Sequence, residues 1–182
     1  FCALLALLMG TNAQETTNYK EKHPYKDWVK IAPKLDDAFL TTPEAIRIAD
    51  NVLLYQHTTG GWPKNVYMPA ELTADEYKKV LAAKNNVNES TIDNSATSTE
   101  IRYLSRIYLA TRIEKYKDAA LEGIRYLLKA QYPNGGWPQF WPRSKGYYTH
   151  ITYNDNAMVN VMNLLRDVYS LSLIHISEPT RP

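Results

Sequence analysis

The sequence predicts an all-α fold built from repeated helical hairpins, on two observations. The first is a phrase that occurs twice, as QHTTGGWPK at residues 56–64 and as QYPNGGWPQ at residues 131–139, 75 residues apart. The second is the spacing of apolar residues before each copy, which is that of one face of a helix. A fixed unit of helix and sharp turn is typical of a helical repeat.

The turn in each copy is predicted from its glycine pair and the Trp-Pro that follows. Glycine takes positive φ without strain after a helix, and proline holds the residue before it in an extended conformation. Trp62 and Trp137 are therefore rigid, either as exposed platforms for a sugar ring or as plugs that close the hairpins. Because Lys64 and Asn65 follow only the first tryptophan, we assign Trp62, Lys64 and Asn65 to substrate binding and expect Trp137 to be packed.

Helix starts and apolar spacing place the other elements. Thr42 with Pro43 is a helix start, and Thr73 with Glu76 is a capping box. The expected helices span residues 42–56, 73–83, 95–112, 119–130 and 156–170. Residues 14–33 predict an irregular lead-in with Trp28 buried, and residues 147–153 are the one candidate for a strand. The last helix carries Met158, Met162, Leu165, Val168 and Tyr169 on one face. Because its packing partners are expected to follow Ser170, Met158, Met162, Leu165 and Tyr169 should face water in this chain.

Both ends of the chain are interpreted as lying outside the fold. Residues 1–13 are uncharged, apolar and followed by small residues, as in the second half of a secretory signal peptide, and they contain the single cysteine. Residues 171–181 match the translation of a sequencing adapter, so we interpret residues 171–182 as a non-native tail. Residues 14–170 are then enough for one domain, or for part of a larger one, in a secreted or periplasmic protein.

The charge of the chain is nearly balanced, with 21 basic and 19 acidic residues. No run of Lys or Arg supports a nucleic-acid partner, and no membrane association is expected after signal cleavage. Aromatic residues make up 12% of the chain and include 14 tyrosines. This composition suits a polar cleft that stacks on its ligand.

Two of the predicted helices begin with acidic and amide residues. The segments are DNSAT at residues 93–97 and NDNAM at residues 154–158, and aligning Ala96 with Ala157 places Asn94 opposite Asp155. In repeated hairpins, equivalent loops face a common cleft, where carboxylate and amide oxygens suit Ca²⁺. The alternative is that these side chains cap their helices.

Four ordered motifs resemble those of the family 10 polysaccharide lyases, which are pectate lyases. They are GGWPKN at 60–65, TIDN at 91–94, QYPNGGWPQ at 131–139 and ITYND at 151–155. The resemblance covers about residues 28–170. It implies an α/α toroid, incomplete in this chain, and calcium-dependent cleavage of polygalacturonate by β-elimination in a protein that is monomeric at full length.

The resemblance also implies roles for individual residues. Asp93, Asn94 and Asp155 match the calcium ligands of the family, and Asn154 falls among the substrate contacts. The catalytic base of the family is an arginine beyond the last motif. We therefore assign no catalytic residue here and expect the fragment itself to be inactive.

Further candidates and two alternatives stay open at this point. Lys64, Arg102 and Arg125 are the cations that could pair with substrate carboxylates. Asp93 and Asp155 could instead be the acid and base of an inverting glycoside hydrolase on an α/α barrel. The chain could also be a non-catalytic protein that binds an acidic polysaccharide.

Overall fold

The structure is a computed structural model that describes residues 24–151 and 153–170. Throughout these residues the regular secondary structure is helical, with two isolated β-bridges at Thr91–Phe140 and Pro138–Ile151. The prediction of an all-α fold is confirmed. The α-helices are α2 (Pro24–Ile31), α3 (Pro43–Tyr55), α4 (Ala74–Ala83), α5 (Ser98–Thr111), α6 (Glu114–Ala130) and α7 (Ala157–Tyr169).

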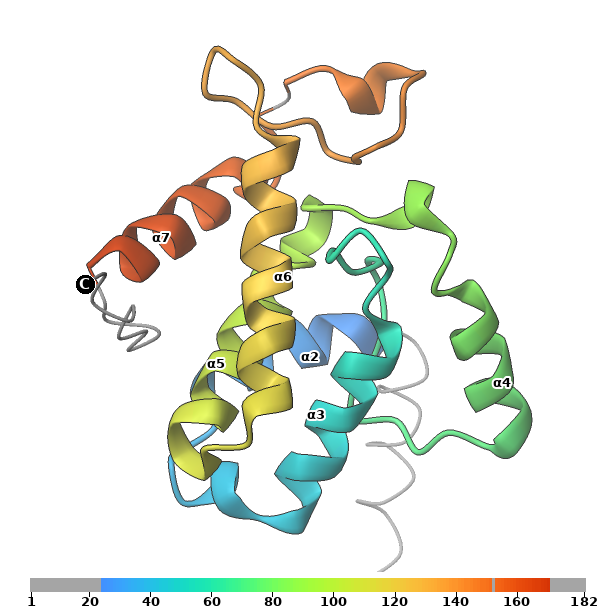
Figure 1. Ribbon diagram of the computed structural model, residues 1–182, viewed down its shortest axis with the longest axis vertical. Helices are drawn as coiled ribbons and strands as arrows, with labels where there is room; N and C mark the ends of the chain where they lie inside the picture. The colour runs from blue at the N-terminus through green and yellow to red at the C-terminus, as the bar shows by residue number, and fades with distance from the viewer. Residues whose placement is uncertain (1–23, 152, 171–182) are drawn as a thin grey trace, which may run out of the picture.

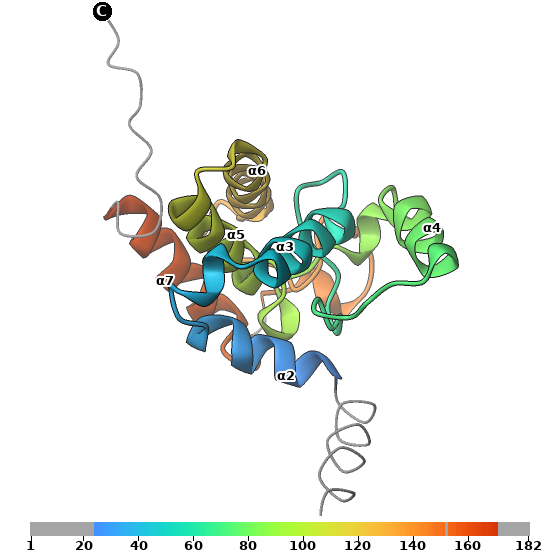
Figure 2. The same ribbon diagram turned by 90° about the horizontal axis from the view of Figure 1, so that it is seen from below.

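Helix α5 lies at the centre of the arrangement and contacts α3, α6 and α7 (Figures 1 and 2). In the view of Figure 1, α3 and α6 run upward, whereas α5 and α7 run downward. The turns that follow α3 and α6 therefore lie toward the same end of the molecule as the beginnings of α5 and α7. This antiparallel order brings both repeated turns and both acid-amide segments to one side.

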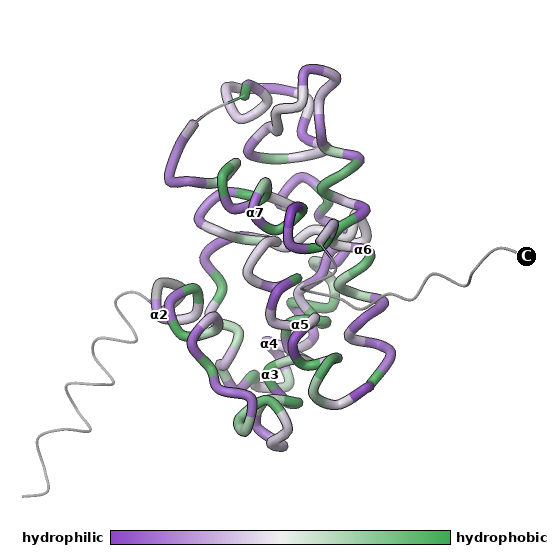
Figure 3. The backbone as a smooth tube through the Cα atoms, turned by 90° about the vertical axis from the view of Figure 1, so that its left-hand side faces the viewer, coloured by the Kyte–Doolittle hydropathy of each residue, from purple (hydrophilic) through white to green (hydrophobic). Residues whose placement is uncertain are grey.

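The core is formed by the apolar faces of these helices. Along the tube in Figure 3, hydrophobic and hydrophilic residues alternate within each helix, as expected for helices with one buried face. The predicted stripe on α5 is buried, and it packs against apolar residues of α3, α6 and α7. The central members of this core are Val52, Ile101, Leu104, Ile107, Leu127, Val161 and Leu164.

The helix starts predicted from capping residues are confirmed. The Thr42 hydroxyl accepts a hydrogen bond from the Ala45 amide at 3.2 Å, which begins α3. Thr73 and Glu76 form the reciprocal capping box at the start of α4. These local interactions need no tertiary partner, so the sequence specifies them directly.

Three expectations about the elements are wrong, and a fourth, on α7, holds only in part. Residues 24–31 form α2 instead of an irregular lead-in, although Trp28 is buried as expected. Helix α6 begins at Glu114, several residues before the expected start. Residues 147–149 form a 3₁₀ turn, and no strand follows before the break in the described residues. On α7, Met162 and Tyr169 are exposed as expected, whereas Met158 is buried together with Ala157, Val161 and Leu164.

The predicted signal segment (1–13) and the predicted adapter-derived tail (171–182) lie outside the described residues. Secretion and the non-native origin of the tail therefore stay predictions. Among residues 24–151 and 153–170, none of the helices has the length and apolar character needed to cross a membrane.

The two copies of the repeated phrase fold into the same turn. In each copy the glutamine side chain donates to the carbonyl of the first glycine, from Gln56 to Gly60 at 2.9 Å and from Gln131 to Gly135 at 3.0 Å. Both of these glycines have positive φ, 94° and 88°. The sequence repeat is thus a structural repeat, down to individual hydrogen bonds.

The turns differ in what surrounds the first glycine. A Cβ placed on Gly60 would lie 2.4 Å from the carbonyl oxygen of Glu122 in α6, whereas a Cβ on Gly135 would meet nothing within 4 Å. The first turn is therefore pressed against α6, and the second is open on this side.

This difference gives a test with a built-in control. Both Gly60→Ala and Gly135→Ala place alanine at positive φ, which costs about 1 kcal/mol. Gly60→Ala adds a clash with backbone and should lose about 3 kcal/mol in all, measured by urea unfolding of the two variants. Equal losses would show that α6 does not press on the first turn.

The contact of α2 with α5 depends on a buried carboxyl group. The Trp28 indole donates to Glu100 Oε1 at 3.0 Å, and its ring packs edge-on against Tyr103. Glu100 Oε2 has no hydrogen-bond partner among the described residues. Burial raises the pKa of Glu100 to about 7, more than the hydrogen bond from Trp28 lowers it.

Stability should therefore fall as the pH rises from about 4.5 to about 7. Because the folded protein holds this proton between the ordinary pKa of 4.5 and about 7, it binds more protons than the unfolded chain over that range. The stabilisation is complete below about pH 4.5 and is lost by about pH 8, on the order of 3 kcal/mol. Glu100→Gln should remove this dependence in urea titrations at several pH values, and the exposed control Glu71→Gln should not. If the free energy of unfolding of Glu100→Gln fell with pH as it does in the unsubstituted protein, Glu100 would not be the group responsible.

Candidate metal and substrate site

The acid-amide segments before α5 and α7 share an unusual backbone conformation. Asn94 and Ser95 have φ of 51° and 62°, and the aligned Asp155 and Asn156 have φ of 45° and 59°. Two consecutive left-handed residues are uncommon outside glycine, although Asn and Asp tolerate this region. The alignment made from the sequence thus matches residues that are equivalent in structure.

The side chains of these segments do not cap their helices. Helix α5 has Thr97 at its N-cap and α7 has Asn156, and neither side chain makes a capping hydrogen bond. Asp93 Oδ1 instead accepts a hydrogen bond from the backbone N–H of Asn94 at 3.0 Å, and Asp93 Oδ2 faces Lys64. The N-caps of α5 and α7 thus make no side-chain capping bond, although Asp93 still satisfies the backbone N–H of Asn94.

Four of the predicted site residues lie together. Lys64 Nζ is 2.5 Å from Asp93 Oδ2, and the Asn94 amide nitrogen donates to Asn65 Oδ1 at 2.9 Å. Asp93 is only 6% exposed, so its charge is held near the surface but largely out of water. We call these residues, Lys64, Asn65, Asp93 and Asn94, the Asp93 cluster.

Asp155 and Asn154 lie on the neighbouring helix start. Both are exposed, and in residues 24–151 and 153–170 no hydrogen bond or ion pair connects their side chains to the Asp93 cluster. The two helix starts are nevertheless in contact, because Asn160 of α7 donates to the Ser95 hydroxyl at 3.1 Å. The structure therefore brings the segments together without joining their carboxylates.

Buried hydroxyl groups fix the Asp93 cluster to both repeated turns. The Thr97 hydroxyl accepts from the Trp62 amide at 3.0 Å and donates to the Thr91 carbonyl at 2.8 Å. The Gln139 carbonyl in the second turn accepts from the Thr91 hydroxyl at 2.6 Å and from the Ile92 amide at 3.0 Å. Thr97 itself has φ of 65°, a strained value for a β-branched residue. Such strain persists where the surrounding contacts over-determine the backbone.

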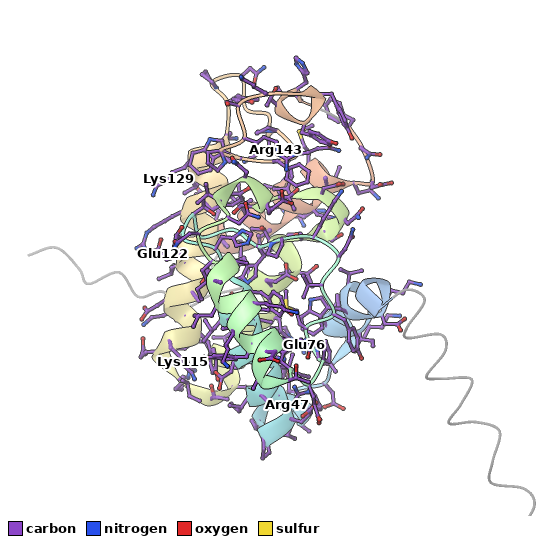
Figure 4. The ribbon with its side chains drawn as sticks, turned by 90° about the vertical axis from the view of Figure 1, so that its right-hand side faces the viewer. Arg47, Glu76, Lys115, Glu122, Lys129 and Arg143 are labelled. Atoms are coloured by element: carbon purple, nitrogen blue, oxygen red, sulfur yellow. The ribbon has the colours of Figure 1, made fainter. Side chains whose placement is uncertain are left out.

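Sequence reasoning missed an aromatic and cationic loop beside the cluster, residues 143–149, which we call the tyrosine loop. Arg143 lies over the rings of Phe140 and Tyr148, and Figure 4 shows it near the loop end of the molecule. Tyr147 is 62% exposed. A hydrogen bond with Tyr148, burial and the nearby charge of Asp93 raise the pKa of Tyr147. The signal in the sequence was RSKGYY at residues 143–148, two cations and two tyrosines around a glycine.

The interpretation of Trp62 as an exposed sugar platform is wrong. Trp62 is 0% exposed and Trp137 is 4% exposed. Each indole donates to a helix carbonyl, Trp62 to Val52 at 2.7 Å and Trp137 to Leu127 at 2.8 Å. Both tryptophans are plugs that tie a turn back to the helix before it, so the expected difference in their roles is also wrong.

Two of the candidate cations are engaged away from the Asp93 cluster. Arg102 pairs with Asp167 of α7 at 2.7 Å, and Arg125 pairs with Glu122 one turn earlier on α6 at 2.5 Å. Lys64 is the one sequence-predicted cation that the described residues place at the cluster.

The donor chemistry of the site is that of oxygen. No group of three His, Cys, Asp or Glu side chains that could hold a metal occurs in residues 24–151 or 153–170. What the site offers is carboxylate and amide oxygens from Asp93, Asn94, Asn65 and the neighbouring Asp155. Hard cations such as Ca²⁺ accept such mixed oxygen ligands, whereas zinc prefers nitrogen and sulfur.

Comparison with known proteins places the chain in a family. The sequence model of the family "Pectic acid lyase" matches residues 56–174. The chain belongs to the pectic acid lyase family. The match includes both repeated turns, both acid-amide segments and the tyrosine loop. No curated protein matches the chain.

Solved structures agree with this pectic acid lyase assignment. The chain is similar to a family 10 polysaccharide lyase from Cellvibrio cellulosa, with 32% identity and a TM-score of 0.55. It is also similar to a variant of a family 10 lyase from the same organism, solved with trigalacturonic acid, with 29% identity and a TM-score of 0.59. Each alignment covers 83% of this chain and 42% of the solved chain. The fold is that of the α/α toroid to which these lyases belong.

The burial of both tryptophans gives a prediction. Trp62→Ala and Trp137→Ala should each destabilise the protein by about 3 to 5 kcal/mol, because a large core ring is removed. Thermal and urea unfolding of the two variants will measure this. A Trp62→Ala variant that kept its stability but lost affinity for polygalacturonate would restore the platform interpretation.

Proposed function

We propose that this chain is part of a calcium-dependent pectate lyase that cleaves polygalacturonate by β-elimination. The observation that carries the proposal is the pair of equivalent left-handed acid-amide segments at the starts of α5 and α7, in a member of the pectic acid lyase family. The complex of a similar lyase with trigalacturonic acid supports an acidic galacturonate substrate.

Asp93, Asn94 and Asp155 would hold the calcium ion. Their oxygen atoms fit its preference for hard ligands, and Asp93 Oδ2 already faces the positive charge of Lys64. When bound, calcium would stabilise the negative charge that develops beside the substrate carboxylate after the proton on carbon 5 is removed. Asp93 can serve a cation in this way only if Lys64 moves aside.

The residues of the chain itself would bind and orient the sugar. Lys64, once released from Asp93, can pair with a substrate carboxylate, and Asn65 and Asn154 offer amide groups to its hydroxyls. Trp62 is excluded from these contacts by its burial. No residue of this chain is assigned as the base that removes the proton.

The glycoside hydrolase alternative is disfavoured. It needs one of Asp93 and Asp155 to donate a proton to the leaving oxygen. The two oxygens of Asp93 instead contact Lys64 Nζ at 2.5 Å and the backbone N–H of Asn94 at 3.0 Å, so neither is directed at a leaving group. Family membership points the same way, since the matching family consists of lyases.

Calcium titration of the chain tests the metal assignment. By isothermal calorimetry, Asp155→Asn should weaken calcium binding at least about tenfold while the melting temperature stays unchanged, because asparagine tolerates the positive φ of this position and an exposed carboxylate contributes little to the core. Lys64→Gln should tighten calcium binding, because the ammonium group that competes for Asp93 is gone. Asp75→Ala, on the exposed face of α4, is the control. Unchanged affinity in both site variants would refute the proposed ligands.

Activity is measured in parallel on polygalacturonate, with calcium and with a chelator. Only β-elimination leaves a double bond conjugated to the carboxylate, so ultraviolet absorbance of the product separates a lyase from a hydrolase. A protein carrying these motifs that released reducing ends without this absorbance would overturn the proposed reaction.

A further inference from the structure

The tyrosine loop has a backbone that is held in place by hydrogen bonds. Its backbone is held at several points: the Gln139 amide donates to the Tyr148 carbonyl at 3.0 Å, and the Tyr132 hydroxyl donates to the Thr149 carbonyl at 2.6 Å. Gly146, with φ of 93°, allows the chain to enter the 3₁₀ turn Tyr147–Thr149. The side chains of this loop are thus presented on a fixed frame.

The ring of Tyr147 is rigid and faces outward. One side of the ring packs on Tyr148, with centroids 3.9 Å apart and planes inclined by 36°. Tyr148 in turn packs edge-on against Phe140 at 5.3 Å. Since Tyr147 is 62% exposed, its other side is turned to solvent. A flat ring backed by two further rings can hold a ligand with little loss of side-chain entropy.

Two other exposed tyrosines lack this packing against aromatic rings. Tyr77 on α4 is 50% exposed and Tyr169 at the end of α7 is 91% exposed. Neither packs against another aromatic ring in residues 24–151 or 153–170. Of these three exposed tyrosines, only Tyr147 is held by packing on another aromatic ring.

Two cations lie over rings of the aromatic stack, and a third, Lys145, belongs to the same loop. Arg143 lies 4.4 Å from the centroid of Phe140 and is fixed by Glu89 at 2.9 Å. Lys64 lies 5.4 Å from the centroid of the same ring. Lys145 is exposed and makes no ion pair with any described residue. Arg143 thus holds the loop in place, whereas Lys145 keeps its charge available.

The tyrosine loop also adjoins the Asp93 cluster. Lys64 pairs with Asp93 and lies over the ring of Phe140, which packs against Tyr148 of the loop. A backbone bridge between Thr91, two residues before Asp93, and Phe140, three residues before the loop, holds the two segments side by side. A chain of sugars seated at the Asp93 cluster can therefore continue over the tyrosine loop.

We propose that Tyr147 and Lys145 form a calcium-independent binding subsite for an acidic sugar next to the Asp93 cluster. The exposed side of the Tyr147 ring takes the C–H face of a pyranose, and the Lys145 ammonium pairs with the carboxylate of that sugar. The choice of galacturonate as the sugar rests on the proposed function. The subsite itself rests on the exposed ring, its aromatic backing and the unpaired cation.

Binding without turnover tests this subsite. The full chain and its variants are titrated with polygalacturonate and with its methyl ester, in a chelator, by calorimetry and affinity electrophoresis. Tyr147→Ala should weaken binding of both polymers about five- to tenfold. Lys145→Gln should weaken binding of polygalacturonate about threefold at low salt, and should leave the methyl ester, which lacks the charge, unaffected. The matched controls Tyr77→Ala and Lys78→Gln, both on α4, should change neither.

The outcomes separate this inference from the proposed function. Unchanged binding by Tyr147→Ala, with folding confirmed by circular dichroism, overturns the subsite even if the protein is a calcium-dependent lyase. Weakened binding in a protein that releases reducing ends without unsaturated product supports the subsite and refutes the reaction. Equal effects of Lys145→Gln on the acid and the ester would refute pairing with a carboxylate.

Discussion

Trp62 connects three parts of the molecule, and the candidate site depends on it. Its ring nitrogen bonds to the Val52 carbonyl of α3, and its backbone amide bonds to the Thr97 hydroxyl beside the site. The ring packs so closely on α6 that a Cβ added to Gly123 would lie 2.8 Å from it. One buried side chain thereby sets the position of the first turn relative to two helices and the Asp93 segment.

The second tryptophan does the same for the second turn, and the two systems meet at Gln139. The Gln139 carbonyl, two residues after Trp137, accepts from both Thr91 and Ile92. The position of Asp93 thus depends on how the two buried tryptophans pack their hairpins. This is why large changes in the core are expected to alter the site, although no core residue touches the proposed ligand.

How much of this could be predicted from the sequence depended on whether the deciding contact was local. Thr42 and the Thr73–Glu76 box act within one helical turn, so α3 and α4 were predicted to within a few residues. The start of α6 was missed because residues 114–118 are mostly charged, although Tyr116 among them is buried. Likewise, α2 is polar in sequence and is held by the bond from Trp28 to Glu100, 72 residues away.

The same distinction applies to the site. The pairing of Asn94 with Asp155 followed from repeat alignment, because equivalent positions in a repeat adopt equivalent backbones. The rigidity of Trp62 was also evident, but the side to which its ring turns depends on α6 and Gly123. The role of Tyr147 could not be derived, since the rings and cations around it come from separate segments, including Phe140 and Lys64.

The left-handed residues beside Asp93 have a consequence for how a ligand is received. Asn94, Ser95 and Thr97 all have positive φ, a conformation that a free peptide would seldom hold. Folding of the hairpins imposes this conformation before any ligand binds. Its cost in chain entropy and backbone strain therefore lowers the stability of the fold and not the affinity for the ligand. Association at this segment then requires little backbone rearrangement, and its affinity reflects the contacts themselves more than the cost of ordering a loop.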